Sequence, residues 1–411
     1  MTMACMSDVP VLSLSRIGSR RPLVFSWGVS SYFGWGVYGL NLMLHLAHHP
    51  DIVPCCAADF GPADVVLDPL RQQRIAALAR TSMPLWKALG QTEGEWVKLD
   101  HPLLEGVGND LVTSTAAHGK RLIGNPSIGV AFLEQATLSP EARQRAGRYA
   151  RIITGSSWNE QALRRQGVAA VTTVLQGVDT ALYHPAPRTG LYPGRFVIFS
   201  GGKLEYRKGQ DLVLAAFRAF HQRHKEALLI AAWQSHWTQF LENAVGHPGI
   251  VPPRCDADGI PDVTGWAVAN GIPAHAVIAI PHIPNLIMPY VVREADVALF
   301  ANRCEGGTNL VAMECLACGI PAIMSANTGH LDLLRHNIAL PLQRQAPAHS
   351  EHYDTTDWGE SDVEEMVEKL ETVWRDRDAA AAMGQRAAQF MTGMSWPKQL
   401  DLLLQAIQAY L

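Results

Sequence analysis

A glycine-rich loop followed by an apolar helical run holds the residues with the clearest capacity for chemistry. It follows the apolar segment 296–300, and the apolar run after it ends at Gly319. A glycine loop that leads into a helix presents free backbone N–H groups and the positive end of the helix dipole, which suits a phosphate. The residues that we expect to bind this anion are Gly307, Thr308, Asn309 and Leu310.

Two glutamates flank the expected phosphate position. Glu305 lies on the loop and Glu314 lies on the helical run. One carboxylate therefore reaches a ligand beside the phosphate, and the other reaches hydroxyl groups on its far side. Paired carboxylates also occur as nucleophile and acid in retaining glycoside hydrolases. A hydrolase does not need a phosphate cradle, so the adjoining loop argues against that alternative.

A second loop supplies positive charge. It follows the strand-like segment 196–200 and contains Gly202, Lys203 and Lys208. Glycine lets the backbone approach a ligand closely, and two ammonium groups neutralise a diphosphate. Basic loop residues are usually only solvated, but this loop stands at a strand end opposite Glu305. That placement favours a diphosphate site.

A third glycine-rich turn lies at residues 30–39. Gly34, Gly36 and Gly39 follow the letters GxGxxG, with the bulky Trp35 inside the turn. The letters alone are weak evidence for a dinucleotide site. Asp59 is the only acid near the end of the next strand-like run, which argues against a nicotinamide cofactor. We therefore expect Gly34 and Gly36 to permit close approach of a nucleotide ligand.

The sequence offers no convincing metal site. Asp256-Ala257-Asp258 has the ligand types for a divalent cation, but its flanks are typical of a turn. Cys315 and Cys318 form a CxxC pair without a second pair or nearby histidines, so we interpret them as packing residues. We expect no cofactor and no metal.

Composition limits the functional classes. The chain has 411 residues, of which 48% are hydrophobic and 18% charged, and its net charge is −4. This size predicts two or three domains, and the charge implies no nucleic-acid surface. No apolar run approaches the ~18 residues of a membrane span, and we see no signal peptide. Seven cysteines, an odd number, suggest reduced thiols and a cytoplasmic protein.

Strand-like and helix-like segments alternate along most of the chain, which predicts α/β domains with mostly parallel sheets. We expect helices at 37–49, 139–148, 158–166, 210–223, 285–293 and 308–318, with strands between them. The expected organisation is a loose tail at 1–20, a first domain at 21–184, a proline-rich linker at 185–194 and a second domain at 195–396, with a terminal helix at 397–411 returning to the first domain.

Several motifs together resemble the retaining glycosyltransferases of family four, over roughly residues 22 to 411. Segment 202–212 is similar to the family's GR(L)…KGxDLL motif, and segment 305–319 to its paired-glutamate block ending in ACG-(I/V)-P. Segment 153–184 resembles its domain crossover, and Trp396 the aromatic residue before its terminal helix. The resemblance implies the GT-B fold, two Rossmann-like domains facing a cleft.

The resemblance also implies roles for single residues. Lys203 stands where the family usually has arginine, and Glu134 where many members have a histidine, so we expect Glu134 to face the reacting sugar or acceptor. Glu305 and Glu314 are separated by eight residues instead of seven. By resemblance, Glu314 accepts from the ribose and Glu305 from the donor sugar. The nucleobase is expected at 280–283, which includes His282 and Ile283.

The implied activity is transfer of a sugar from a UDP or GDP donor to a saccharide, glycoconjugate or lipid-linked acceptor, with retained configuration and no metal. A lipid-linked acceptor implies peripheral contact with the inner face of the membrane. An aromatic stretch that includes Trp27, Tyr32, Phe33, Trp35 and Tyr38 suggests a sugar-stacking or lipid-facing surface. The alternatives are a GT-B phosphorylase or sugar-nucleotide epimerase, a nicotinamide oxidoreductase and an inactive binding subunit.

Overall fold

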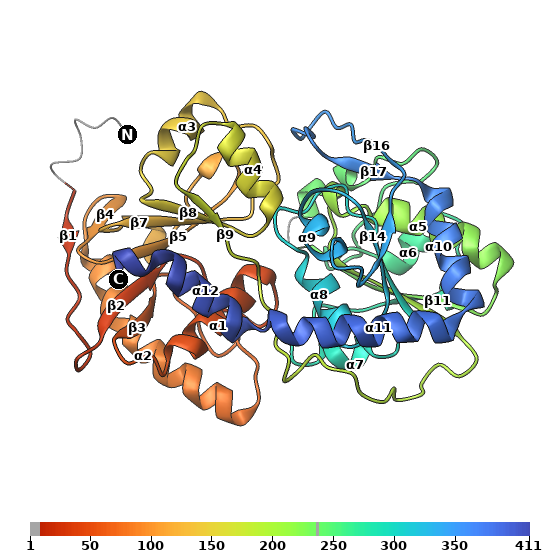
Figure 1. Cartoon of the computed structure of the whole chain (residues 1–411), viewed down its shortest axis with the longest axis horizontal. Coiled ribbons are helices and arrows are strands. Elements are labelled where there is room, and N and C mark those ends of the chain that lie inside the picture. Colours follow the sequence, from red (N-terminus) through yellow and green to blue (C-terminus); the bar gives the residue numbers. More distant parts are fainter. Residues whose placement is uncertain (1–8, 236–237) are drawn as a thin grey trace.

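A computed structural model of the chain describes residues 9–235 and 238–411 (Figure 1). The first domain is built on six parallel strands. Their short apolar sequences are buried on both faces, as parallel strands between helices are. In spatial order they are β3 (Ile52–Cys56), β2 (Arg21–Phe25), β5 (Leu103–Val107), β7 (Ser127–Ala131), β8 (Arg151–Thr154) and β9 (Val171–Thr173).

Helices cover both faces of this sheet because successive strand residues point to opposite sides. Leu23 and Phe25 pack with α1 (Gly34–Leu46), whereas Val24 packs with α2 (Pro69–Gln91). Asp68 caps the start of α2 by accepting from the N–H groups of Leu70 and Arg71. The remaining helices of the domain are α3 (Pro140–Ala146) and α4 (Ser157–Arg165).

A small parallel sheet lies at the edge of the first domain. Its strands are β1 (Val11–Leu12), β4 (Trp96–Leu99) and β6 (Arg121–Ile123). Since β1 pairs with β4, the segment after residue 8 is attached to the domain. The expectation of a loose tail is therefore wrong for residues 9–20, and residues 1–8 lie outside the described part of the chain.

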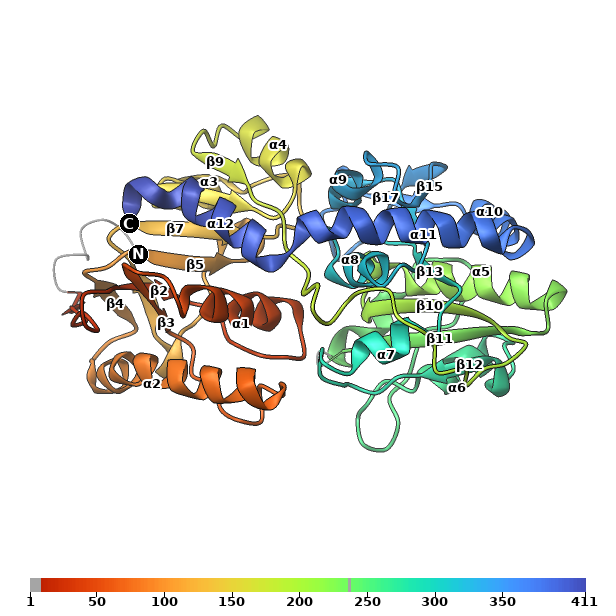
Figure 2. The ribbon, with the colours of Figure 1, turned by 60° about the horizontal axis from the view of Figure 1, so that its bottom comes forward.

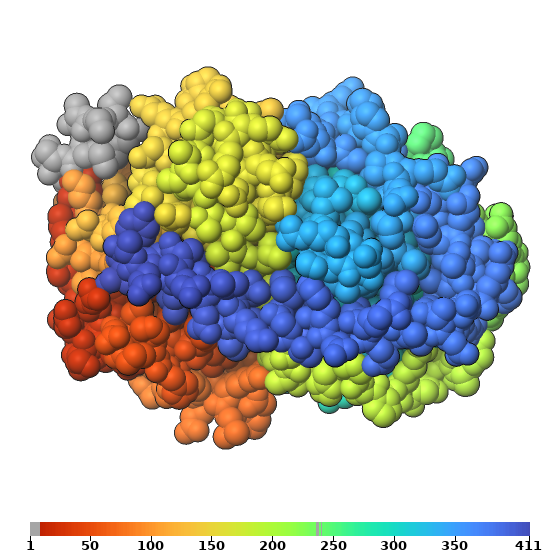
Figure 3. Space-filling view, in the orientation of Figure 1, coloured from red at the N-terminus to blue at the C-terminus, as the bar shows by residue number. Residues whose placement is uncertain are grey.

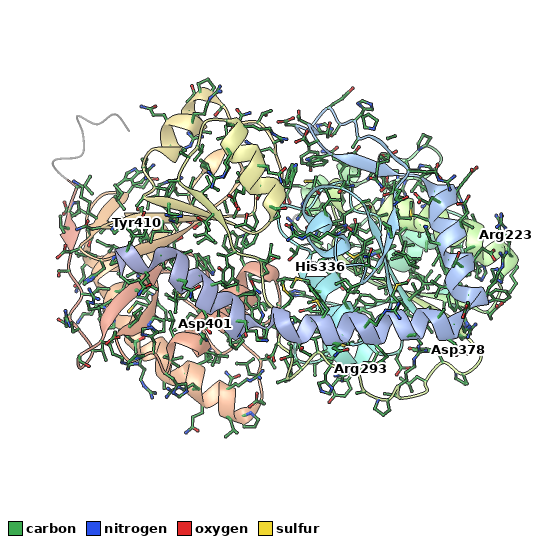
Figure 4. All side chains as sticks on the ribbon, viewed as in Figure 1. Arg223, Arg293, His336, Asp378, Asp401 and Tyr410 are labelled. Carbon is green, nitrogen blue, oxygen red and sulfur yellow. The ribbon has the colours of Figure 1, made fainter. Side chains whose placement is uncertain are left out.

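The segment 185–194 connects the domains without helix or strand. Arg293 of the second domain binds the residues just before this segment: its Nη2 donates to the carbonyl of Leu182, and its Nε donates to the carbonyl of His184. Figure 4 labels Arg293 at the lower edge of the second domain. These two bonds fix the start of the connection.

The second domain repeats the architecture. Six parallel strands follow the order β12 (Val277–Ala279), β11 (Ala227–Gln234), β10 (Phe196–Lys203), β13 (Val297–Phe300), β14 (Ala322–Ser325) and β15 (Leu340–Leu342). Helices α5 (Gln210–Arg223), α6 (Val263–Ala269) and α10 (Val363–Arg375) pack on one face. The other face is covered by α7 (Met288–Val292), α8 (Leu310–Ala317) and α11 (Arg377–Met391), with the short α9 (Leu331–Leu334) nearby.

The last helix, α12 (Trp396–Ile407), lies on the first domain. Figures 2 and 3 show α11 and α12 as a continuous blue ridge across both domains. Asp401 lies 2.9 Å from His45 of α1, and the Tyr410 hydroxyl donates to the carbonyl of Ala150 (Figure 4). The chain therefore crosses between the domains twice.

An antiparallel hairpin projects from the second domain toward α4 of the first (Figure 1). Its strands are β16 (Gln345–Pro347) and β17 (Gly359–Ser361). Thr137 donates to Asp354 of the connecting loop, and Arg165 forms an ion pair with Asp357. The hairpin thus links the two domains near the carboxyl ends of their strands.

Among residues 9–235 and 238–411, every helix is too short or too polar to cross a membrane.

Candidate functional site

The glycine loop of the second domain connects β13 to α8, and Asn309 forms its end. Asn309 has φ of +64°, a left-handed conformation that asparagine tolerates, and its side chain caps α8 by accepting from the Ala312 N–H at 3.3 Å. The N–H groups of Thr308, Asn309 and Leu310 have no hydrogen-bond partner among the described residues. The entrance of α8 therefore offers donors to an anion.

The lysine loop lies against this entrance. A Cβ added to Gly201 would lie 2.8 Å from Cγ1 of Val311 in the first turn of α8. Gly202 has φ of +136°, which only glycine adopts readily, and a Cβ there would lie 3.6 Å from Cδ of Lys208. Glycine at these positions lets β10, α8 and the Lys208 stem meet.

Lys208 and Glu305 form the centre of the site. Lys208 Nζ lies 2.5 Å from Glu305 Oε1, and the two side chains are only 11% and 6% exposed. Asn302 also donates to this carboxylate. Burial raises the pKa of Glu305, but the charges of Lys208 and Arg207 outweigh burial and lower it. Glu305 is therefore ionised at neutral pH.

Lys203 lies apart from this pair. Its Nζ is 3.1 Å from Oε2 of Glu205, and its side chain is 37% exposed. Of the two predicted lysines, only Lys208 contacts Glu305. Lys203 remains connected to the site through Glu205, which lies 2.6 Å from Arg207.

Glu134 reaches the site from the first domain. It follows β7, and its Oε1 lies 2.6 Å from Nε of Arg207. Trp358 of the hairpin donates to the Glu134 carbonyl at 2.7 Å. Arg207 was not singled out from the sequence, although its position beside Lys208 was a signal that could have identified it.

Arg303 stabilises the glycine loop after β13 and the lysine loop after β10 through buried contacts. Its side chain is fully buried and bonds both carboxylate oxygens of Asp211, at 2.9 and 2.8 Å, and one of Glu360, at 2.7 Å. Its Nη1 donates to the Tyr206 carbonyl, and its guanidinium lies 4.2 Å from the centre of the Tyr206 ring. Sequence reasoning missed Arg303, because it did not predict that Asp211 of the KGxDL segment would be buried opposite it.

Glu314 faces a different set of partners. Its Oε1 accepts from Asn285 Nδ2 at 2.7 Å, and its side chain is nearly buried. Burial raises its pKa to about 7, although hydrogen bonds from Asn285 and Tyr183 oppose the rise. Asn285 also donates its N–H to the Ser31 carbonyl of the first domain, at 2.6 Å. Glu314 therefore lies close to the boundary between the domains.

The remaining predicted residues lie around these two glutamates. A Cβ on Gly34 would be 3.5 Å from Leu310, so this glycine faces the entrance of α8. Gly36 instead packs on Ser30, where a Cβ would come within 2.4 Å. A Cβ on Gly307 would lie 2.8 Å from Gln176. The exposed His282 ring lies against the Tyr32 ring at a tilt of 40°, with ring centres 4.9 Å apart, and Ile283 is partly exposed.

The predicted aromatic surface is wrong for two of its members. Trp27 and Tyr38 are each 4% exposed and belong to the core beneath α1. Trp35 packs edge-on against Phe132, whereas Phe33 is 52% exposed. Most of these rings pack inside the protein, because the turn 28–36 folds back onto the helix that follows it.

The rejected metal motifs have structural roles. Asp256 Oδ1 accepts from the N–H groups of Asp258 and Ile260, as expected of a turn. Cys315 and Cys318 are buried in the apolar core around α8. Within the described residues, no three His, Cys, Asp or Glu side chains are grouped to hold a metal ion.

The first domain also has a cavity of about 220 Å³, lined by residues that include Arg21, His101 and Tyr410. It lies where β2 begins, at the edge opposite the strand ends that carry Glu134. In parallel α/β sheets, ligands bind beyond the carboxyl ends of the strands. We therefore place the functional site at Lys208 and Glu305 and not in this cavity.

Comparisons with known proteins bear on the fold and the class of protein. Residues 290–403, which include the α8 entrance, match the family described as "Family 4 Glycosyltransferase in conflict systems". No curated protein sequence matches the chain. Many solved structures do match its fold.

Three of these structures have the following similarities. Sucrose-phosphate synthase from Thermosynechococcus elongatus has a TM-score of 0.61 and 14% identity, over 95% of this chain and 100% of that one. Anabaena HepE, solved with UDP and glucose, has a TM-score of 0.62 and 12% identity, over 94% and 99%. An E. coli structure described as trehalose-6-phosphate bound with UDP-2-fluoro glucose has 0.58 and 11%, over 94% and 99%.

The class of protein follows from these findings. The two Rossmann-like domains have the GT-B fold, and the family match confirms the resemblance to family four. The chain therefore has the GT-B fold, and its residues 290–403 are similar to family-four glycosyltransferases.

Proposed function

We propose that the protein transfers a sugar from a UDP or GDP donor to a saccharide, glycoconjugate or lipid-linked acceptor, with retention of anomeric configuration and without a metal. The main support for this proposal is the Lys208–Glu305 pair beside the start of α8, whose N–H groups have no partner among the described residues. A diphosphate between them is neutralised on one side and hydrogen-bonded on the other. The UDP in the HepE structure favours UDP as the first donor to test.

The proposed chemistry is cleavage of the bond between the anomeric carbon and the diphosphate. Negative charge grows on the leaving oxygen, and Lys208, Lys203 and the α8 N–H groups stabilise it. Removing one such donor typically lowers a rate by about 10²–10³-fold. Because these cations neutralise the charge, the reaction needs no metal. The acceptor oxygen bonds to the anomeric carbon on the face that the diphosphate leaves, and the diphosphate takes the acceptor proton. The configuration is therefore retained.

The two glutamates and Glu134 divide the recognition of the substrates. Glu305 accepts from hydroxyls of the donor sugar, and Glu314 from those of the ribose. The nucleobase lies along residues 280–283. Glu134 faces the sugar or acceptor from the first domain, next to Arg207. The low exposure of Lys208 and Glu305 implies that donor entry separates this pair.

A second GT-B activity, sugar phosphorolysis, is less well supported, since the role proposed for Glu314 is to accept from a ribose, which a phosphorylase does not need. We expect the protein in the cytoplasm, where sugar nucleotides are made. Contact with the inner face of the membrane is proposed only for a lipid-linked acceptor.

A nucleotide screen tests the proposed donor class. At about 100 times its dissociation constant, the right nucleoside diphosphate adds about 2.7 kcal/mol of stability. We expect UDP or GDP to raise the melting temperature and ADP to have a smaller effect, with no change when a chelator is present. The corresponding sugar nucleotide should then release its diphosphate in a transfer assay. Stabilisation by free phosphate alone, with no nucleotide effect, would favour a phosphorylase.

Donor binding should depend on pH through Glu314. Its pKa of about 7 means that the carboxylate gains its charge between pH 6 and 8, a change of about tenfold in the ionised fraction. An ionised carboxylate is the stronger acceptor for ribose hydroxyls. The affinity for UDP-glucose, whose diphosphate is esterified at both ends and does not titrate in this range, should therefore rise about tenfold from pH 6 to 8 when measured by calorimetry. Glu314→Gln should abolish the rise, whereas the exposed Glu364→Gln should keep it; a rise that survives Glu314→Gln contradicts this role.

A further inference from the structure

Arg207 contacts three carboxylates and has no role in the chemistry described above. It lies on the short turn Tyr206–Lys208 after β10. Its Nε lies 2.6 Å from Glu134, and its Nη2 lies 2.6 Å from Glu205. Its Nη1 lies 3.4 Å from Oε2 of Glu305, the oxygen that Lys208 does not contact. Its side chain is only 14% exposed.

Glu305 therefore has two cations, one on each oxygen. His330 also faces it, but burial lowers the His330 pKa to about 4, so this imidazole is neutral at pH 7. Glu134 and Cys304 also interact with Glu305. Glu134 is an acid that opposes the charge of Glu305, and burial raises the pKa of the Cys304 thiol well above its ordinary value, so this thiol stays neutral. Lys208 and Arg207 are thus the sources of positive charge for this buried carboxylate.

The proposed function requires Lys208 to bind the diphosphate. In doing so it leaves Glu305, and a buried carboxylate without a cation takes up a proton in preference to staying charged. Arg207 is less free to leave than Lys208, because its other nitrogens form ion pairs with Glu134 and Glu205. Its guanidinium is also charged at every accessible pH.

Resting on that proposed function, we propose that Arg207 is a positioning residue. It keeps Glu305 ionised and directed at the donor sugar while Lys208 is engaged with the diphosphate. Because Glu134 belongs to the first domain, all three carboxylate contacts of Arg207 form only when the two domains are together. Arg207 therefore connects domain closure to the charge state of Glu305.

The test is the pH profile of kcat in Arg207→Met, followed as UDP release from UDP-glucose or as nucleotide release from the donor that the screen selects. The wild type should keep its rate down to pH 6. Arg207→Met should lose rate on the acid side, by about tenfold for each pH unit below a new apparent pKa. Most of the rate should return at pH 8.5. Arg207→Lys should give an intermediate profile and serves in place of Arg207→Met if that variant fails to fold.

A matched control separates this role from a merely structural one. Arg165→Gln removes another ion pair between the domains, to Asp357, without touching Glu305. It should keep the wild-type pH profile. If Arg207→Met lowers kcat equally at all pH values, or not at all, Arg207 has only a structural role and the proposal is wrong. Lys208→Ala, run in parallel, distinguishes the failures: normal turnover in that variant overturns the proposed function and this inference together.

Discussion

Replacing Lys208 by alanine is expected to lower the rate of sugar transfer by about 10²–10³-fold. Its ammonium is the predicted partner of the leaving diphosphate, and the charge of that group increases in the transition state. The fold should survive, because Glu305 keeps Arg207 as a cation on its other oxygen. The measurement is kcat with saturating donor, with thermal unfolding as the check on folding.

The control for this variant is Lys225→Ala. Lys225 is exposed and precedes β11, so it lies at the opposite end of the sheet from Lys208. It should have the wild-type rate. Near-normal turnover by a folded Lys208→Ala protein contradicts the proposed stabilisation of the leaving group.

Replacing Arg303 by methionine is expected to destabilise the second domain by about 3–5 kcal/mol. The substitution leaves the fully buried Asp211 carboxylate without its cation. Burial raises the pKa of Asp211, but Arg303 outweighs burial and lowers it below the ordinary 3.8. The stability that this carboxylate contributes is therefore present above pH 3.8 and lost as the pH falls below it. Urea unfolding at pH 7 measures the loss.

An exposed ion pair provides the comparison. Arg188 lies 2.9 Å from Asp296, but its side chain is 45% exposed. Arg188→Met should cost at most about 1 kcal/mol. If the two variants unfold at the same urea concentration, the buried pair does not support the loops as described. Arg303→Met should also reduce transfer, since the lost guanidinium donates from Nη1 to the carbonyl of Tyr206, in the short turn that carries Lys208.

Much of the fold could be predicted from the sequence. The expected α/β architecture of two Rossmann-like domains is confirmed. The helix predicted at 210–223 has those bounds in the structure, and the apolar segment 296–300 contains the strand β13, since both have clear apolar patterns. α2 was missed because its apolar residues are diluted by basic ones and Pro84 lies inside it. β5 was missed because Glu105 interrupts its apolar run, although that side chain is buried.

The site was only partly predictable. The glycine loop and Lys208 could be identified because glycine and lysine just after buried strands are typical of phosphate sites. Contacts that join distant parts of the chain left no pattern in the sequence, and these include the Arg303–Asp211 pair and the Arg207–Glu134 contact between domains. The packing role of Gly36 was equally hidden, because a glycine that admits a neighbour has the same letter as one that admits a ligand.

The proposed function depends on a nucleoside diphosphate lying between Lys208 and the entrance of α8. The most direct measurement is a crystal structure of the protein with UDP, or with GDP if the screen selects it. We predict that a phosphate oxygen lies within hydrogen-bond distance of both Lys208 Nζ and the Leu310 N–H, with Lys208 released from Glu305. A diphosphate bound elsewhere, with the Lys208–Glu305 pair intact, contradicts the proposed function.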